Sequence, residues 1–158
     1  MKKIKIYMVT IMLFIFTMSI SSFKAEAQVS VNFQFFYDNL SPYGTWMSYP
    51  QYGYVWRPNA GREFRPYRTR GHWVWSDEYE WIWVSDYEWG WATFHYGRWH
   101  YDSYYGWLWL PDYDWAPAWV MWRSGGDYYG WAPLDAGFSF SISFGNYSPP
   151  VDYWCFAP

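Results

Sequence analysis

Apolar and polar side chains alternate in short runs along most of this 158-residue chain, and this pattern predicts β-strands. The first run spans 28–36, where Val29, Val31, Phe33 and Phe35 share one face. Further strands are expected to begin at the Gly-x-Trp positions 44, 71 and 97, and a late alternating run covers 138–144. No stretch after residue 27 has helical periodicity, so the pattern predicts an all-β fold.

The strand pattern recurs three times, at spacings of 27 and 26 residues. The units occupy about 44–70, 71–96 and 97–123, and each opens with Gly-x-Trp. Five rings of the second unit recur 26 positions later in the third: Trp73, Trp81, Trp83, Tyr87 and Trp89 return as Trp99, Trp107, Trp109, Tyr113 and Trp115. Matching ring positions behind a matching glycine indicate an internal repeat.

Each unit is predicted to form an antiparallel hairpin, with turns at 50–52, 76–79 and 103–105. Pro58 and Pro111 are expected to end the second strand of their units. A fourth hairpin is expected over 119–131, because Ser124-Gly-Gly-Asp127 tolerates positive φ. The hairpins are expected to form a twisted sheet, a partly closed barrel or a small sandwich.

Tryptophans and aliphatic residues occupy opposite faces of the second strands at 80–85 and 106–111. Both faces are therefore apolar, so each strand must be covered on both sides or leave a face of rings open. Two readings of the rings follow. They fill a core that lacks aliphatic residues, or some of them form a platform for a ligand.

The N-terminus has the features of a secretory signal peptide over 1–27. Lysines at 2, 3 and 5 precede an apolar run from Ile6 to Ile20, and Ala25-Glu-Ala27 offers a cleavage site. An uncleaved anchor is the alternative, although the run is short for a membrane span. We therefore expect an exported protein of the periplasm or cell surface, with no stable membrane span after cleavage and one domain over 28–158.

Composition after residue 27 sets further limits. Aromatic residues supply 42 of these 131 positions, whereas Val, Ile and Leu together supply thirteen, so the core must be built largely from rings. Seven arginines face thirteen acidic residues. A surface of this charge attracts neither nucleic acid nor an anionic membrane.

The residues that could carry chemistry form no known catalytic or metal motif. Cys155 is the sole cysteine, which excludes an internal disulfide; it is expected to be a small buried residue of a strand, with pairing between molecules as the alternative. His72, His95 and His100 match no metal-ligand spacing. No catalytic residue, cofactor or metal is therefore assigned.

Acidic residues cluster near the turns of the second and third units, at Asp77, Glu78, Glu80, Asp86, Glu88, Asp112 and Asp114. Acids in turns are most simply solvated loop residues. The alternative is a carbohydrate-active hydrolase, which would need two of these carboxylates across one cleft.

Two groups of residues are candidates for binding. Sugars stack on flat aromatic faces, and the candidate stacking rings are Trp81, Trp83, Trp107 and Trp109. The candidate contacts for an anion are Arg62, Arg65, Arg68 and Arg70. For the arginines, the simpler expectation is a solvated loop in which they lie over rings.

Several motifs together resemble a family of exported, aromatic- and proline-rich repeat domains of unknown function, known mainly from Gram-negative bacteria. They are Phe36-Tyr-Asp, Pro42-Tyr-Gly-Thr-Trp46, Tyr54-Val-Trp-Arg-Pro58, Phe94-His-Tyr-Gly-Arg-Trp99, Trp115-Ala-Pro-Ala-Trp119 and Gly130-Trp-Ala-Pro-Leu134. The resemblance covers about 33–134 and implies export and a repeat domain, with no catalytic residue to carry over. Relatives usually continue beyond a segment like Tyr153–Pro158, which leaves the completeness of the C-terminus open.

These observations favour a non-enzymatic module of the cell envelope that serves binding or structural interaction. The expected partner is an envelope polysaccharide or peptidoglycan, held by stacked rings. The alternatives are the hydrolase and a purely structural domain that contacts another envelope protein.

Overall fold

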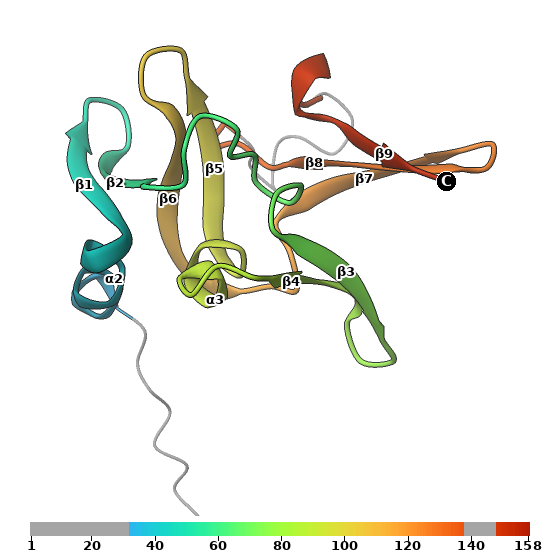
Figure 1. Cartoon of the computed structure of the whole chain (residues 1–158), viewed down its shortest axis with the longest axis horizontal. Helices are drawn as coiled ribbons and strands as arrows, with labels where there is room; N and C mark the ends of the chain where they lie inside the picture. The colour runs from blue at the N-terminus through green and yellow to red at the C-terminus, as the bar shows by residue number, and fades with distance from the viewer. Residues whose placement is uncertain (1–31, 138–147) are drawn as a thin grey trace, which may run out of the picture. The chain divides into compact units, whose positions relative to one another are not determined.

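The computed structural model describes residues 32–137 and 148–158, which form nine strands and four short helices (Figure 1). The strands are β1 (Gly44–Tyr49), β2 (Gly53–Pro58), β3 (Gly71–Ser76), β4 (Glu80–Ser85), β5 (Tyr96–Asp102), β6 (Gly106–Trp115), β7 (Val120–Gly125), β8 (Tyr128–Pro133) and β9 (Cys155–Ala157). The helices are α2 (Phe33–Leu40) and α3 (Gly90–Thr93), with 3-10 turns η1 (Ser41–Tyr43) and η2 (Val151–Tyr153). The expected signal peptide and the strand candidate at 138–144 lie outside the described residues.

The four predicted hairpins are confirmed, and all strand pairs are antiparallel. They form three sheets among the described residues, with strand orders β1-β2-β6-β5, β3-β4 and β7-β8-β9. The order within each sheet is open, so none of the three closes into a barrel. The first and third repeat units share one sheet, whereas the second forms a sheet of its own.

The leading glycine of the first two units has a clear structural reason. A Cβ at Gly44 would lie 2.5 Å from the indole of Trp56, and a Cβ at Gly71 would lie 2.6 Å from the indole of Trp83. In each hairpin this indole lies on the second strand, directly opposite the tryptophan of the Gly-x-Trp motif: Trp56 pairs with Trp46, and Trp83 pairs with Trp73. The repeated glycine therefore leaves room for a ring from the neighbouring strand to cover the backbone.

The core consists mainly of aromatic rings, as the composition predicts. Trp56, Trp99 and Trp109 are fully buried and lie side by side across β2, β6 and β5, because Trp109 pairs with both of the others. Phe36 of α2 meets the Trp109 ring edge-on, with centroids 5.1 Å apart. Edge-on contacts of this kind recur through the core and suit the charge distribution of aromatic rings.

The strand expected at 28–36 is wrong for its described part, because α2 begins at Phe33. The side chain of Asn32 caps the helix by accepting a hydrogen bond from the Phe35 amide, 2.9 Å away. Phe36 and Leu40 then occupy one face and are buried. The absence of helices predicted after residue 27 is therefore also wrong.

The end predicted for the third unit's second strand is wrong as well. Pro58 is the last residue of β2, as expected, but β6 continues past Pro111 to Trp115. The register between β5 and β6 shifts at Tyr96 and Gly97, so Tyr96 pairs with Trp115 while Gly97 pairs with Pro111. This bulge accommodates the proline within a long strand.

Tyr67 ties the loop between β2 and β3 to the rest of the core. Its hydroxyl donates to the carbonyl of Phe94 and accepts from the amide of Trp119, each at 3.0 Å. Burial raises the pKa of this hydroxyl. Nearby, the amide of Trp83 donates to the carbonyl of Pro117 at 3.1 Å, which fastens β4 to the segment before β7.

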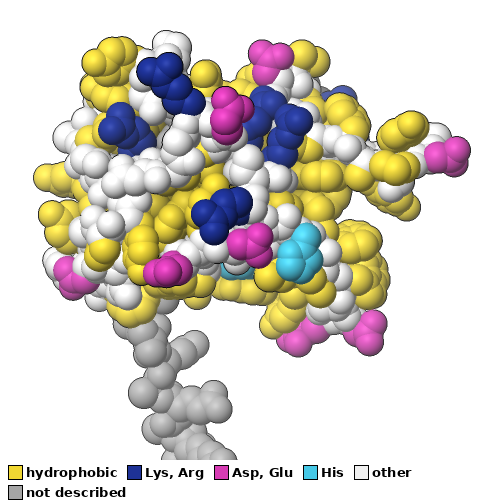
Figure 2. All heavy atoms as spheres, in the orientation of Figure 1, with side chains coloured by type: hydrophobic (Ala, Val, Ile, Leu, Met, Phe, Trp, Pro, Cys, Tyr) yellow, Lys and Arg dark blue, Asp and Glu magenta, His cyan; other side chains and the backbone are white. Residues whose placement is uncertain are grey.

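Much of the visible surface is hydrophobic, with charged side chains scattered between the rings (Figure 2). Within the described part of the chain, no helix is both long and apolar enough to cross a membrane.

Candidate functional site

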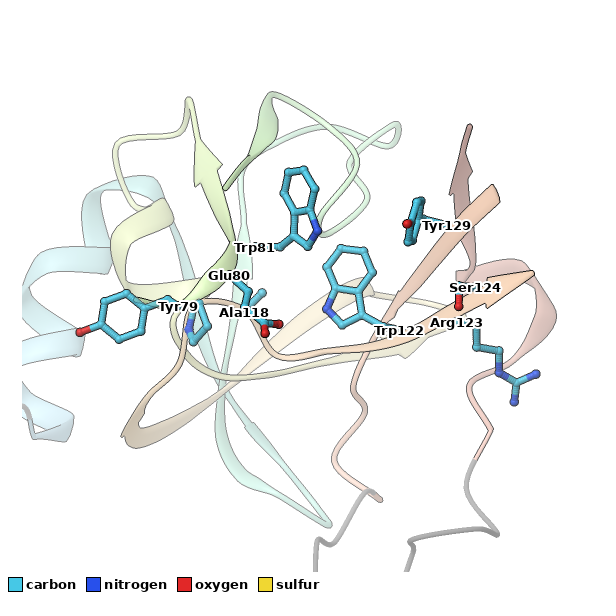
Figure 3. A pocket seen from close by; sticks show the side chains of 9 residues that line it. Tyr79, Glu80, Trp81, Ala118, Trp122, Arg123, Ser124 and Tyr129 are labelled. Atoms are coloured by element: carbon cyan, nitrogen blue, oxygen red, sulfur yellow. The ribbon is translucent and has the colours of Figure 1, made fainter. Parts of the chain in front are cut away.

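The candidate site is a cleft of about 440 Å³ between the β3–β4 hairpin and the β7–β8 hairpin (Figure 3). The first hairpin contributes Tyr79, Glu80 and Trp81; the second contributes Trp122, Arg123, Ser124 and Tyr129. Pro117 and Ala118, which precede β7, complete the lining. The hydrogen bond from Trp83 to Pro117 holds this segment against β4, so the two walls of the cleft are joined at its base.

Four rings of the lining are exposed, and three of them point toward the opening; the fourth, Tyr79, is 43% exposed and packs edge-on against Trp115. Trp81 is 42% exposed, Trp122 39% and Tyr129 59%. Figure 3 shows these rings projecting toward the same opening from the two hairpins. Aromatic rings that are rigid and only partly covered can give a large contact area at little cost in conformational entropy.

Neighbouring rings hold the two indoles from behind. Trp75 meets Trp81 edge-on with centroids 5.4 Å apart. Trp122 packs against Trp73 at 4.6 Å and against Trp131 at 5.9 Å. Trp122 is thus joined to the core through Trp73 and Trp131, whereas Trp81 is supported by a neighbouring ring that is itself exposed.

The two charged side chains of the cleft lining point to different places. Glu80 is exposed and lies among the side chains around the opening, whereas Arg123 extends away from the rings (Figure 3). The Arg123 guanidinium lies 4.9 Å from the centre of the Trp154 ring and donates to the Ser148 hydroxyl at 3.2 Å. The carboxylate of Glu80 therefore gives the opening its negative charge.

The structure places the four predicted stacking tryptophans differently from one another. Trp81 lies at the cleft. Trp83, Trp107 and Trp109 are only 2%, 7% and 0% exposed, so their faces are covered by the core. Trp122 and Tyr129, which sequence reasoning missed, supply the other open rings. Both lie in the fourth hairpin, away from the second strands of the repeat units from which the candidates were taken.

The four predicted anion contacts do not gather at one site. Arg65 donates to the carbonyl of Asp152, and Arg70 lies over the Tyr87 ring with its guanidinium carbon 5.0 Å from the ring centre. Arg62 is exposed. Arg68 is the member that lines a second cavity. The simpler expectation, arginines lying over rings, therefore describes Arg70.

The second cavity, of about 620 Å³, lies beside β9. Its lining includes Arg68, Trp73, Trp131, Trp154 and Cys155. Cys155 opens β9 and is half-buried, which agrees with the strand predicted there. Burial raises the pKa of the thiol, and the positive charges of Arg68 and Arg65 only partly oppose this effect. The thiol is accordingly held in its less reactive, protonated form.

The three histidines lie apart, and within 32–137 and 148–158 no three His, Cys, Asp or Glu side chains come together as metal ligands would. His100 pairs with Asp135 at 3.0 Å. His95 stacks on Trp115, with centroids 5.6 Å apart, and its Nδ1 lies 3.0 Å from the carbonyl of Ala116. These contacts are structural ones.

Acidification is expected to destabilise the protein through His95. Burial lowers the pKa of its imidazole in the folded state, so the unfolded state takes up a proton first as the pH falls below about 6.5. The contribution of His95 to the free energy of unfolding is therefore fully present above about pH 7. It is lost as the pH falls through about 6.5 toward the lowered pKa of the folded state. Urea unfolding at pH 7.5 and pH 5.5 should show a smaller difference for His95→Gln than for the unchanged protein. An equal difference in both proteins would contradict the assignment.

The acidic residues do not form a carboxylate pair across the cleft. Asp77, Glu78, Asp86 and Glu88 are exposed, and Glu88 accepts a hydrogen bond from the Tyr43 hydroxyl. Of the described residues that line the cleft, Glu80 alone carries a carboxylate. Glycoside hydrolysis ordinarily requires two carboxylates on opposite sides of the scissile bond.

Comparison with known proteins identifies the family. The profile of a family of unknown function (DUF6600) matches residues 37–138, which is most of the described chain, and the protein belongs to this family. No curated protein and no solved structure matches it significantly.

Proposed function

We propose that this member of the DUF6600 family is an exported, non-enzymatic module that binds glycans of the cell envelope in the cleft between its second and fourth hairpins. The observation that carries the proposal is the convergence of three exposed rings, Trp81, Trp122 and Tyr129, on one opening. The volume of about 440 Å³ falls within the range of small-ligand sites, about 300–1,000 Å³. It suits one or two sugar units of a longer chain.

The physical basis of binding is the match between a sugar ring and an indole. One face of a pyranose presents C–H groups, which pack against an aromatic face, while its hydroxyls remain at the edge. Ser124 and Tyr129 carry hydroxyls in the lining of the cleft, and these can form hydrogen bonds with such edges. The cleft thus offers the apolar face and the polar rim that a carbohydrate requires.

The proposal of export is supported by the first 27 residues, whose basic start, apolar run and Ala25-Glu-Ala27 site are typical of a secretory signal. Peptidoglycan and outer polysaccharides are the glycans that a protein in the periplasm or at the cell surface would meet. Recovery of protein that begins at Gln28 supports this location. Protein that retains Met1 and stays in the cytoplasm contradicts it.

Removal of either tryptophan of the cleft is expected to weaken glycan binding strongly. Each of Trp81→Ala and Trp122→Ala should weaken binding at least tenfold, because truncation of a ring at the centre of an interface costs about 2 kcal/mol or more. The measurement is tryptophan fluorescence of the mature protein titrated with peptidoglycan fragments and envelope polysaccharides.

The matched control is Trp91→Ala, since Trp91 is an equally exposed tryptophan on α3, packed on Phe35 and away from the cleft. It should leave binding unchanged. A saturable fluorescence change that survives both cleft substitutions would move the site elsewhere. No response to any glycan would contradict the proposed function.

A protein partner is the second candidate, favoured by exposed rings outside the cleft. Tyr104 and Phe156 are the most exposed aromatic side chains of β-hairpin 5–6 and of β9. Large exposed apolar areas often mark sites of protein contact. If glycans have no effect, cross-linking from these two positions in the native envelope is the experiment that tests this alternative.

A further inference from the structure

We infer that the cleft prefers glycans that carry a free ammonium group, such as de-N-acetylated amino sugars, and that Glu80 is the residue that selects them. This inference rests on the proposed function and names the class of glycan. Three observations carry it: the backbone of Glu80, its place among the open rings, and the engagement of Arg123, the other charged residue of the lining, with Trp154 and Ser148.

The backbone of Glu80 occupies a position that glycine holds elsewhere in the same chain. Glu80 is the first residue of β4 and has φ of +59°, whereas Gly53 and Gly106, the first residues of β2 and β6, have φ of +72° and +78°. Glycine adopts such angles freely, while a residue with a Cβ is strained there. The backbone of the second repeat unit is thus strained at a turn position where the other two units have glycine.

Glutamate stands in place of glycine in the second repeat unit, and among the three repeat hairpins it is the turn of this unit that borders the cleft. A Cβ at Gly53 or Gly106 would meet nothing within 4 Å, so space is no reason for glycine in the other units. Glu80 lines the opening together with Trp81 and Trp122. Strained residues are retained where the surrounding structure or a function requires them, and here the strain places a carboxylate beside exposed indoles.

The charge of Glu80 is available to a ligand. The structure shows no ion pair for this carboxylate with any residue of 32–137 or 148–158. Arg123, the other charged residue of the lining, is engaged with Trp154 and Ser148. The excess of thirteen acidic residues over seven arginines after residue 27 also favours cations over anions near the surface.

An ammonium group complements this arrangement in two ways. It forms an ion pair with the carboxylate, and it is attracted to the electron-rich faces of the tryptophans. An N-acetylated sugar can use the rings alone, and an acidic sugar is repelled by the carboxylate. The cleft should therefore distinguish two glycans that have the same backbone and differ only in the acetyl group.

The test compares glucosamine hexamer with N-acetylglucosamine hexamer in fluorescence or calorimetric titrations of the mature protein. At pH 6 and low salt, where the amino groups are protonated, we expect the glucosamine hexamer to bind about tenfold more tightly. The preference should shrink as salt is added, since an exposed ion pair is screened. Equal affinities would overturn the inference and leave the proposed function intact. Failure of both hexamers and of every other glycan would overturn the proposed function as well.

Two substitutions of Glu80 separate its charge from its role in the turn. Glu80→Gln should bring the affinities for the two hexamers to within about twofold of each other. Glu80→Gly should lose the preference equally, yet unfold at the same or a higher urea concentration, because it restores the glycine of the other two turns. A preference that survives either substitution would overturn the role of Glu80.

Discussion

Replacement of Gly97 by alanine is expected to lower the free energy of unfolding by about 3–5 kcal/mol, through backbone strain and overpacking combined. Gly97 has φ of +107°, in a region that side chains rarely allow. An added Cβ would lie 2.1 Å from the carbonyl oxygen of Leu110 and 2.9 Å from the amide nitrogen of Asp112. Both atoms belong to the backbone of β6, so relief requires a change in the bulge itself.

Two other glycines provide the controls for this experiment. Gly125→Ala adds a methyl group where nothing lies within 4 Å and where φ is not positive, and it should be nearly neutral. Gly53→Ala also meets open space, but at φ of +72°, so it should cost only the strain of about 1–2 kcal/mol. Urea unfolding followed by circular dichroism measures all three. A Gly97→Ala variant no less stable than Gly53→Ala would show that the bulge adapts to a side chain.

The repeated glycine shows how far the sequence predicts the fold. Local signals placed every hairpin of the described chain, because turn residues and ring alternation act within a few positions. The same signals do not reveal why each glycine is needed. Gly44 and Gly71 make room for an indole and for a carbonyl of the paired strand, whereas Gly97 makes room for a bulge, and these reasons depend on the opposite strand.

The helix α2 was missed because its residues satisfy two patterns at once. Phe33 and Phe35 continue the alternation from Val29, while Phe33, Phe36 and Leu40 have the spacing of a helix face. The deciding signal is Asn32, a favourable N-cap at the start of the helical spacing. The carbonyl of Leu40 then accepts a hydrogen bond from the Trp56 indole at 3.1 Å, a tertiary contact that alternation cannot predict.

The partition of hairpins into sheets could not be read from the repeat. Identical ring spacing suggests equivalent units, yet the first unit pairs with the third through Trp56 and Trp109, and the second stands apart. Such long-range pairing depends on which aromatic side chains pack well against one another, and this cannot be seen in the spacing of the rings along the chain. For the same reason the sequence found Trp81 at the cleft but could not separate it from its buried counterpart Trp107.

Replacement of Trp109 by alanine is expected to destabilise the protein by about 3–5 kcal/mol, the usual cost of removing a large ring from a core. Trp109 is fully buried and pairs with Trp56 on one side and Trp99 on the other. Its ring also meets Phe36 of α2 at 5.1 Å. One side chain therefore joins the first hairpin and the helix to the third hairpin.

The position of Trp109 also predicts where the loss of stability will appear. Hydrogen exchange of the Trp109→Ala variant should rise most at β1, β2 and α2, which all contact this residue, and least in the separate β3–β4 sheet. Trp91→Ala, which removes an exposed ring, should change neither stability nor exchange by a comparable amount.

Trp109→Phe should lower the free energy of unfolding less than Trp109→Ala does. It keeps a ring in the core and removes an indole nitrogen that has no hydrogen-bond partner among the described residues. A uniform rise in the hydrogen exchange of Trp109→Ala across all three sheets would contradict the prediction for that variant. It would mean that the hairpins unfold together and that the loss of Trp109 is not confined to the first and third repeat units.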